Sequence, residues 1–225
     1  VYGGTFFVFS DYMKPAMRLS ALMGLPVTYV LTHDSIGVGE DGPTHQPVDQ
    51  LAMLRSIPNF TCFRPADARE TAAGWKLAML KKDGPVGLAL SRQGLANIEG
   101  SGEEALKGGY ILKKEEQELE IILLASGSEV NIAYDAAKIL EEKGRGTRVV
   151  SMPSMEIFQE QDRAYREEVL PGSIRKRLAV EAAYTGDWYR YVGLDGDVIG
   201  MESFGASGPG GQLFEKFGFT VNNIV

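Results

Sequence analysis

The chain of 225 residues carries 30 acidic and 23 basic residues, which gives a net charge of −7 at pH 7 and a pI near 5.0. This length suffices for one large domain, or for two ordinary domains that each bury a real core. The acidic balance excludes a general attraction to nucleic acid or to anionic membranes, so we expect neither as a partner.

Two further features bear on where in the cell the protein is expected. No apolar run approaches the roughly 20 residues of a transmembrane helix, and no basic-then-apolar signal opens the chain. The one cysteine, Cys62, cannot form an internal disulfide and lies in an apolar segment, so we expect a buried and unreactive thiol. Together these features predict a cytoplasmic protein.

The first hundred residues alternate short β-rich runs with longer helical patterns. Asp67, with Glu70 three residues later, predicts the N-terminal cap of one of these helices. Repeated strand–helix–strand order predicts a parallel sheet covered by helices on both faces. In chain order, we expect strands at 5–9, 27–31, 60–63 and 86–90, and helices at 13–23, 48–54 and 67–82.

Residues 101–118 are rich in glycine and charged residues and are predicted to form an interdomain linker, although 110–112 resembles a short strand. The predicted fold class is α/β, with two domains at 1–100 and 119–225, each a mostly parallel sheet covered by helices. In the second half we expect strands at 121–125, 148–152, 176–181 and 198–202, and helices at 130–143, 157–170 and 212–217.

A polar loop at 32–47 follows the second predicted strand and contains both histidines of the chain, His33 and His45. Open α/β sheets place ligand-binding groups at such strand ends. Both imidazoles can exchange protons near neutral pH, and Asp41 adds a carboxylate between them. Three interpretations stay open on these residues alone: contact with a polyhydroxylated substrate, a structural role in a surface loop, or a metal site.

Two other sets of side chains can carry chemistry. Phe6, Phe9 and Tyr12 are spaced by three residues and can line a flat slot for a heteroaromatic ring, although core packing is the simpler interpretation of the spacing. Arg92 follows strand 86–90 as His33 follows its own strand. A guanidinium there can bind a phosphate in bidentate geometry, and a surface salt bridge explains it equally well.

The loop sequence HDSIGVGEDGPTHQP at 33–47 strongly resembles that of transketolases. A match of this length, with further ordered matches along the whole chain, is highly specific. The other matching segments are GGTFFVFSDYMKPAMRLSALMGLPV, LRSIPN, RPAD, ALSRQ, LLASGSEV and FGASGPGGQLFEKFGFT.

The resemblance implies an architecture. Transketolases are homodimers of three-domain chains, in which an N-terminal domain holds the diphosphate of thiamine diphosphate and a divalent metal ion, magnesium or calcium. Residues 1–100 resemble part of the middle domain, which holds the aminopyrimidine ring, and residues 119–225 resemble the C-terminal domain. The N-terminal region would have to be supplied from elsewhere.

The resemblance also implies roles for the residues named above. Phe6, Phe9 and Tyr12 match the aromatic pocket for the aminopyrimidine ring. His33 and His45 match active-site histidines beside the donor sugar's oxygens, Asp41 matches a carboxylate that reads a substrate hydroxyl, and Arg92 matches an arginine that binds the sugar phosphate. No metal ligand is expected in this chain.

The implied reaction transfers a two-carbon ketol unit from a ketose phosphate to an aldose phosphate. The family's cofactor-activating glutamate and its diphosphate-binding Gly-Asp-Gly segment have no counterpart here. We therefore expect the chain alone to be inactive and to bind thiamine diphosphate weakly or not at all. The alternatives are a dihydroxyacetone synthase-like ketol transferase, or a noncatalytic dimerisation or binding module derived from transketolase.

Overall fold

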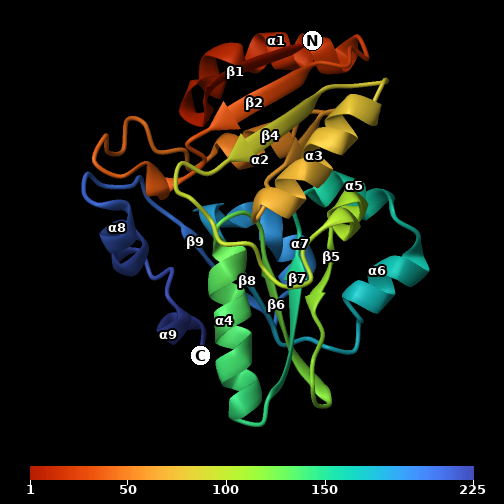
Figure 1. The fold of residues 1–225 in the computed structure, drawn as a ribbon, viewed down its shortest axis with the longest axis vertical. Coiled ribbons are helices and arrows are strands. Elements are labelled where there is room, and N and C mark those ends of the chain that lie inside the picture. Colours follow the sequence, from red (N-terminus) through yellow and green to blue (C-terminus); the bar gives the residue numbers. More distant parts are fainter.

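The computed structural model describes residues 1–225, which form two layered units placed one above the other (Figure 1). The first unit is a four-stranded, fully parallel sheet in the order β1-β2-β4-β3. Its strands are β1 (Tyr2–Phe6), β2 (Thr28–Thr32), β3 (Thr61–Phe63) and β4 (Val86–Leu90), and its helices are α1 (Ser10–Leu22), α2 (Gln50–Arg55) and α3 (Ala68–Leu80).

The second unit is a five-stranded sheet in the order β5-β7-β6-β8-β9, parallel except for the antiparallel pair β5–β7. The predicted α/β class, with two mostly parallel sheets covered by helices, is confirmed. The strands are β5 (Tyr110–Lys113), β6 (Leu119–Ala125), β7 (Gly146–Ser151), β8 (Arg177–Tyr184) and β9 (Asp197–Met201). The helices are α4 (Glu129–Glu142), α5 (Met155–Glu160), α6 (Arg163–Val169), α7 (Tyr189–Val192), α8 (Gly210–Lys216) and α9 (Val221–Ile224).

Three expectations are corrected. The strand expected at 5–9 ends at Phe6, and a 3-10 turn, η1 (Phe7–Phe9), leads into α1 instead. The helix expected at 157–170 is two helices, because Asp162 adopts an extended backbone and caps α6 by accepting from the Tyr165 N–H at 2.8 Å. Residues 110–113, expected within a linker, pair with β7 and so belong to the second sheet.

The start of α3 confirms the capping prediction. The Asp67 carboxylate accepts from the Glu70 N–H at 2.9 Å, and the Glu70 carboxylate reaches back to accept from the Ala66 N–H at 2.7 Å. Glu70 is fully buried and also accepts from the hydroxyls of Tyr110 and Ser151, in β5 and β7. This cap therefore ties the first unit to the second.

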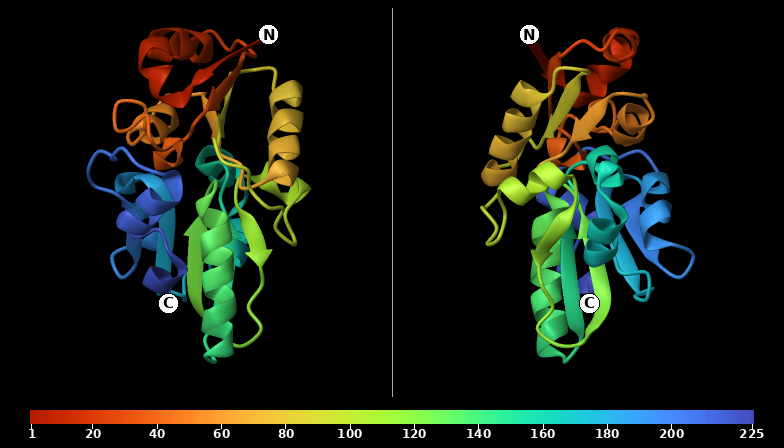
Figure 2. Two further views of the ribbon diagram at one scale, coloured as in Figure 1. Left: turned by 60° about the vertical axis from the view of Figure 1, so that its left-hand side comes forward. Right: turned by 90° about the vertical axis from the view of Figure 1, so that its right-hand side faces the viewer.

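The carboxyl ends of the two sheets face one another. In the first sheet, Phe6 is in register with Thr32, and Thr32 with Leu90, so the residues that follow β1, β2 and β4 emerge together. Figure 2 shows this end of the first unit seated on the second. The backbone continues the contact, since the Gly127 N–H after β6 donates to the carbonyl of Arg64 after β3. The junction between the units thus lies beside the predicted loop.

One apolar cluster crosses this junction. It joins Ile36 and Phe63 of the first unit to Leu123 and Leu213 of the second, all of them buried. A separate cluster, mainly in the first unit, contains Cys62, whose thiol is buried as expected, and burial raises its pKa. No helix of the chain combines the length and apolar character needed to cross a membrane.

Candidate active site at the strand ends of the first sheet

His33 occupies the first position after β2, where the backbone turns sharply. Its φ of 64° lies in the left-handed region, which is uncommon for a residue with a Cβ and is frequent at functional sites. Its Nδ1 hydrogen-bonds to the Thr32 hydroxyl at 3.0 Å, and its ring stacks on Phe6 with centroids 3.8 Å apart. The imidazole is therefore held by β1 and β2 together.

The three predicted aromatic residues form a continuous band with both histidines. Phe6 and Phe9 are nearly parallel, with centroids 6.3 Å apart, and Phe9 lies 6.2 Å from Tyr12. Phe9 also meets His45 edge-on at 5.7 Å. Phe9 is 36% exposed and Tyr12 is 83% exposed, so neither ring fills the core. Exposed aromatic rings of this kind suit a planar heteroaromatic ligand.

The surroundings of His33 favour its neutral form. Burial and the nearby Arg92 guanidinium lower the pKa of His33 below its usual 6.5, whereas Asp41 and Asp34 act in the opposite direction. Arg92 and Asp41 therefore lie within electrostatic reach of this imidazole. The structure gathers all of the predicted site residues at one edge of the first sheet, and a neutral His33 can accept a proton near pH 7.

Arg92 and Asp41 have exposed side chains that make no hydrogen bond or ion pair within the chain. The surface salt bridge considered for Arg92 is thus not formed here. Both charges are available to a ligand at the rim of the aromatic band. No group of three histidine, cysteine or acidic side chains is arranged to hold a metal ion.

The charge on Asp41 can be tested through His33. Because the exposed Asp41 carboxylate raises the pKa of His33, the substitution Asp41→Asn is expected to lower the His33 pKa further. NMR titration measures this directly, since the chain has only two histidines. Asp83→Asn, at an exposed site outside this set, is the control and should leave the His33 pKa unchanged. A rise in the His33 pKa in Asp41→Asn would contradict the assignment.

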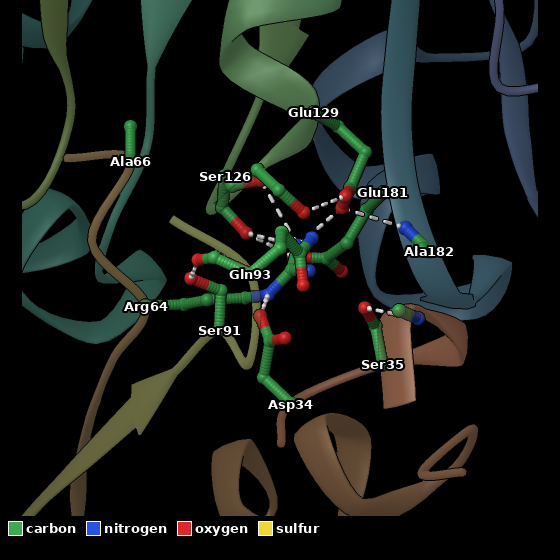
Figure 3. Close-up of polar contacts among 12 residues, drawn as sticks. Asp34, Ser35, Arg64, Ala66, Ser91, Gln93, Ser126, Glu129, Glu181 and Ala182 are labelled. Atoms are coloured by element: carbon green, nitrogen blue, oxygen red, sulfur yellow. Dashed lines mark hydrogen bonds and ion pairs between the residues drawn. The ribbon is translucent and has the colours of Figure 1, made fainter. Parts of the chain in front are cut away.

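A buried ionic network lies directly behind the loop and was not predicted from the sequence. The fully buried Arg64 donates from Nε to Asp34 at 2.8 Å, and from Nη1 to Glu129 at 2.5 Å and to the Ser126 carbonyl at 2.9 Å (Figure 3). Arg64 follows β3 as Arg92 follows β4. The argument that singled out Arg92, its position just after a strand, could therefore also have singled out Arg64.

The same network extends to a second arginine. The Arg55 guanidinium binds both carboxylate oxygens of Glu181, at 2.8 and 2.7 Å, and also binds Asp187 at 3.1 Å. Burial alone would raise the pKa of Glu181, but Arg55 and Arg64 lower it to about 2. Arg55 and Arg64 therefore each join the first unit to acidic groups of the second.

The glycine-rich turn at 205–211, to which no role was assigned from the sequence, packs over the loop. Gln46 donates from Nε2 to the carbonyls of Gly39 and Ala206, both at 2.9 Å. Gly39 has φ of 86°, and a Cβ there would lie 3.3 Å from the Gly208 carbonyl oxygen. Close approach of the two backbones thus requires glycine in the loop.

Comparisons with known proteins agree along the whole chain. A family model described as the transketolase pyrimidine binding domain matches residues 1–97, and one described as the transketolase-like TK C-terminal domain matches residues 108–220. The chain is 56% identical over its full length to a probable transketolase of Streptococcus pneumoniae, of which it covers 34%. It therefore spans about a third of the length of the curated relatives it matches.

Solved structures give the same picture. A transketolase from Leishmania mexicana has a TM-score of 0.95 at 44% identity, covering 100% of this chain and 33% of that chain. A Pichia stipitis transketolase in complex with sedoheptulose-7-phosphate has a TM-score of 0.94 at 46% identity, covering 99% of this chain and 32% of that chain. Both similarities extend across the two units and include the loop at 32–47.

Proposed function

Because the chain belongs to the transketolase family, we propose that it takes part in transferring a two-carbon ketol unit from a ketose phosphate to an aldose phosphate. The single observation that supports this most is the band of His33, Phe6, Phe9 and His45 at the strand ends, with Asp41 and Arg92 unpaired at its rim. The likeness to a transketolase solved with a sugar phosphate supports the substrate class.

Thiamine diphosphate is the cofactor that a transketolase pyrimidine-binding domain implies. The residues present fit its planar ring, since Phe9 and Tyr12 are exposed aromatic residues beside Phe6, and we propose that these three hold it. When bound, the cofactor supplies the electron sink that cleavage next to a carbonyl requires. We propose that a divalent metal ion, magnesium or calcium, is held by residues outside this chain.

The chain's own side chains would bind and protonate the sugar. His33, neutral at pH 7, accepts a proton from a substrate hydroxyl or donates a hydrogen bond to a carbonyl oxygen, and His45 does the same from across the aromatic band. Asp41 accepts a hydrogen bond from a sugar hydroxyl and so favours one stereochemistry. Arg92 binds the phosphate, for which its planar fork is suited.

We further propose that activity requires residues beyond these 225. The active protein would be a cytoplasmic homodimer of chains as long as the curated relatives. The chain carries the aromatic and substrate-facing groups described above, whereas no set of metal ligands was found among its residues. On this proposal, the 225-residue chain alone is inactive and binds thiamine diphosphate weakly or not at all.

The test uses a chimera in which this chain replaces the homologous third of the Streptococcus pneumoniae relative. Given thiamine diphosphate and magnesium, we expect it to transfer a two-carbon unit between sugar phosphates. A folded, dimeric chimera that leaves both sugars unchanged would contradict the proposal.

Within the chimera, Arg92→Leu is expected to raise KM for phosphorylated substrates by about 10- to 100-fold, because a charge-assisted hydrogen bond contributes roughly 1.5–3 kcal/mol. KM for an unphosphorylated acceptor should change little, since that substrate never engages the guanidinium. Arg163→Leu, which removes an exposed arginine of α6, is the matched control. Equal KM changes for both kinds of acceptor would show that Arg92 does not bind phosphate.

A further inference from the structure

The second unit contacts the loop at 32–47, called the substrate loop below, directly at two points and through Arg64 at a third. At its start, Asp34 is ion-paired with Arg64, which in turn binds Glu129 at the start of α4. At its middle, Gly39 packs against the backbone of Gly208. At its end, the side chain of Gln46 donates to the Ala206 carbonyl. The loop between the two histidines is therefore shaped from outside the sheet that carries it.

Arg64 belongs to the first unit by sequence, but the second unit fixes its position. Its N–H donates to the Pro153 carbonyl at 2.8 Å, and its own carbonyl accepts from the Gly127 N–H at 3.2 Å. Its Nη1 reaches Glu129 and the Ser126 carbonyl. Backbone and guanidinium are thus both anchored to the segment that joins β6 to α4 and to the segment after β7.

Asp34 carries this positioning to His33. Its side chain is 1% exposed, and one carboxylate oxygen accepts from Arg64 Nε at 2.8 Å. The preceding residue, His33, has a φ of 64°, a conformation that persists only where the surroundings impose it. The anchored Asp34 therefore directly follows the turn that carries the imidazole stacked on Phe6.

We propose that the second unit is the template for the substrate loop, and that Arg64 is a positioning residue that orients His33 through Asp34. This deepens the proposed function by giving the second unit a role at the site. The orientation of His33 by Arg64 can be tested without substrate. If this test fails, the proposed ketol transfer is not thereby contradicted.

A pair of glycines supplies a matched experiment. Gly127 and Gly144 both have left-handed backbones, with φ of 60° and 79°, so alanine imposes similar backbone strain at each. A Cβ at Gly127 would lie 2.5 Å from Cζ of Arg64, whereas a Cβ at Gly144 meets nothing within 4 Å. Gly127→Ala thus displaces the guanidinium from inside the second unit, and Gly144→Ala is the control.

The readout is the NMR spectrum of the imidazole protons in the 225-residue chain. Stacking on Phe6 at 3.8 Å shields the His33 ring protons, and Phe6→Leu calibrates the unshielded position. In Gly127→Ala we expect the His33 signals to move downfield toward that position. In Gly144→Ala, which shares the backbone strain but not the clash, we expect a smaller loss of thermal stability with His33 signals at their wild-type positions.

A second pair of variants guards against misfolding of Gly127→Ala. Arg64→Lys and Arg55→Lys each keep a buried charge but lose the planar fork, and both weaken contacts between the units. Only Arg64 contacts Asp34, so we expect the His33 shift in Arg64→Lys and not in Arg55→Lys. Wild-type His33 signals in both Gly127→Ala and Arg64→Lys, or equal shifts in the controls, would overturn the proposal.

Discussion

Replacing His33 with alanine in the chimera is expected to lower kcat/KM for ketol transfer by about 10²- to 10⁴-fold, the usual contribution of a positioned proton-transfer group. The imidazole is held neutral by burial and by Arg92, so it can accept a proton near pH 7. Alanine removes this group and leaves no other titratable side chain stacked on Phe6. Steady-state kinetics with a ketose phosphate and an aldose phosphate measure the loss.

The pH dependence separates proton transfer from simple packing. Because the His33 pKa lies below 6.5, wild-type kcat/KM should fall only when the pH drops through that lowered value, as His33 becomes protonated. His33→Ala should lose this acidic limb, and His45→Ala should also lower the rate. Wild-type kinetics in both alanine variants would remove the histidines from the mechanism.

The substitution Arg64→Met is expected to lower the free energy of unfolding of the chain by about 3–5 kcal/mol. The guanidinium is fully buried and compensates Asp34 and Glu129, which would remain as uncompensated carboxylates. A loss of this size is a large part of the roughly 5–15 kcal/mol that stabilises a typical domain. Urea unfolding followed by circular dichroism provides the measurement.

An exposed arginine and a charge-balanced variant control for this result. Arg163→Met, on α6, should change the unfolding free energy by no more than about 0.5 kcal/mol. Adding Asp34→Asn and Glu129→Gln to Arg64→Met removes the stranded charges, so it should recover part of the stability. A loss below about 1 kcal/mol in Arg64→Met would mean that the network contributes little.

Local patterns were enough to predict the sheets and the loop. The alternation of β-rich and helical segments predicted the parallel sheets, and the Asp67–Glu70 cap was predicted because its partners are three residues apart. The loop was predicted to be a strand-end site because both histidines follow an apolar run. In the parallel pair of β1 and β2, Phe6 is in register with Thr32, and this places the Phe6 ring beside His33, the next residue.

Two features that were not predicted correctly depend on contacts distant along the chain. Residues 110–113 lie in a segment that was expected to be a linker, although 110–112 resembles a short strand, and pairing with β7 places them in the second sheet. No role was predicted for Arg64, whose partner Glu129 is 65 residues away along the chain. The strand-end position marks Arg64 as a candidate, but neither propensity nor spacing identifies the partner that compensates its buried charge.

The network around Arg64 also limits how these proteins can exchange parts. Asp34 and Arg64 come from one unit and Glu129 and Glu181 from the other, so the border between the units does not separate independent modules. A hybrid enzyme joined at this border keeps the network complete only if Asp34 and Arg64 retain matching acidic partners at positions 129 and 181.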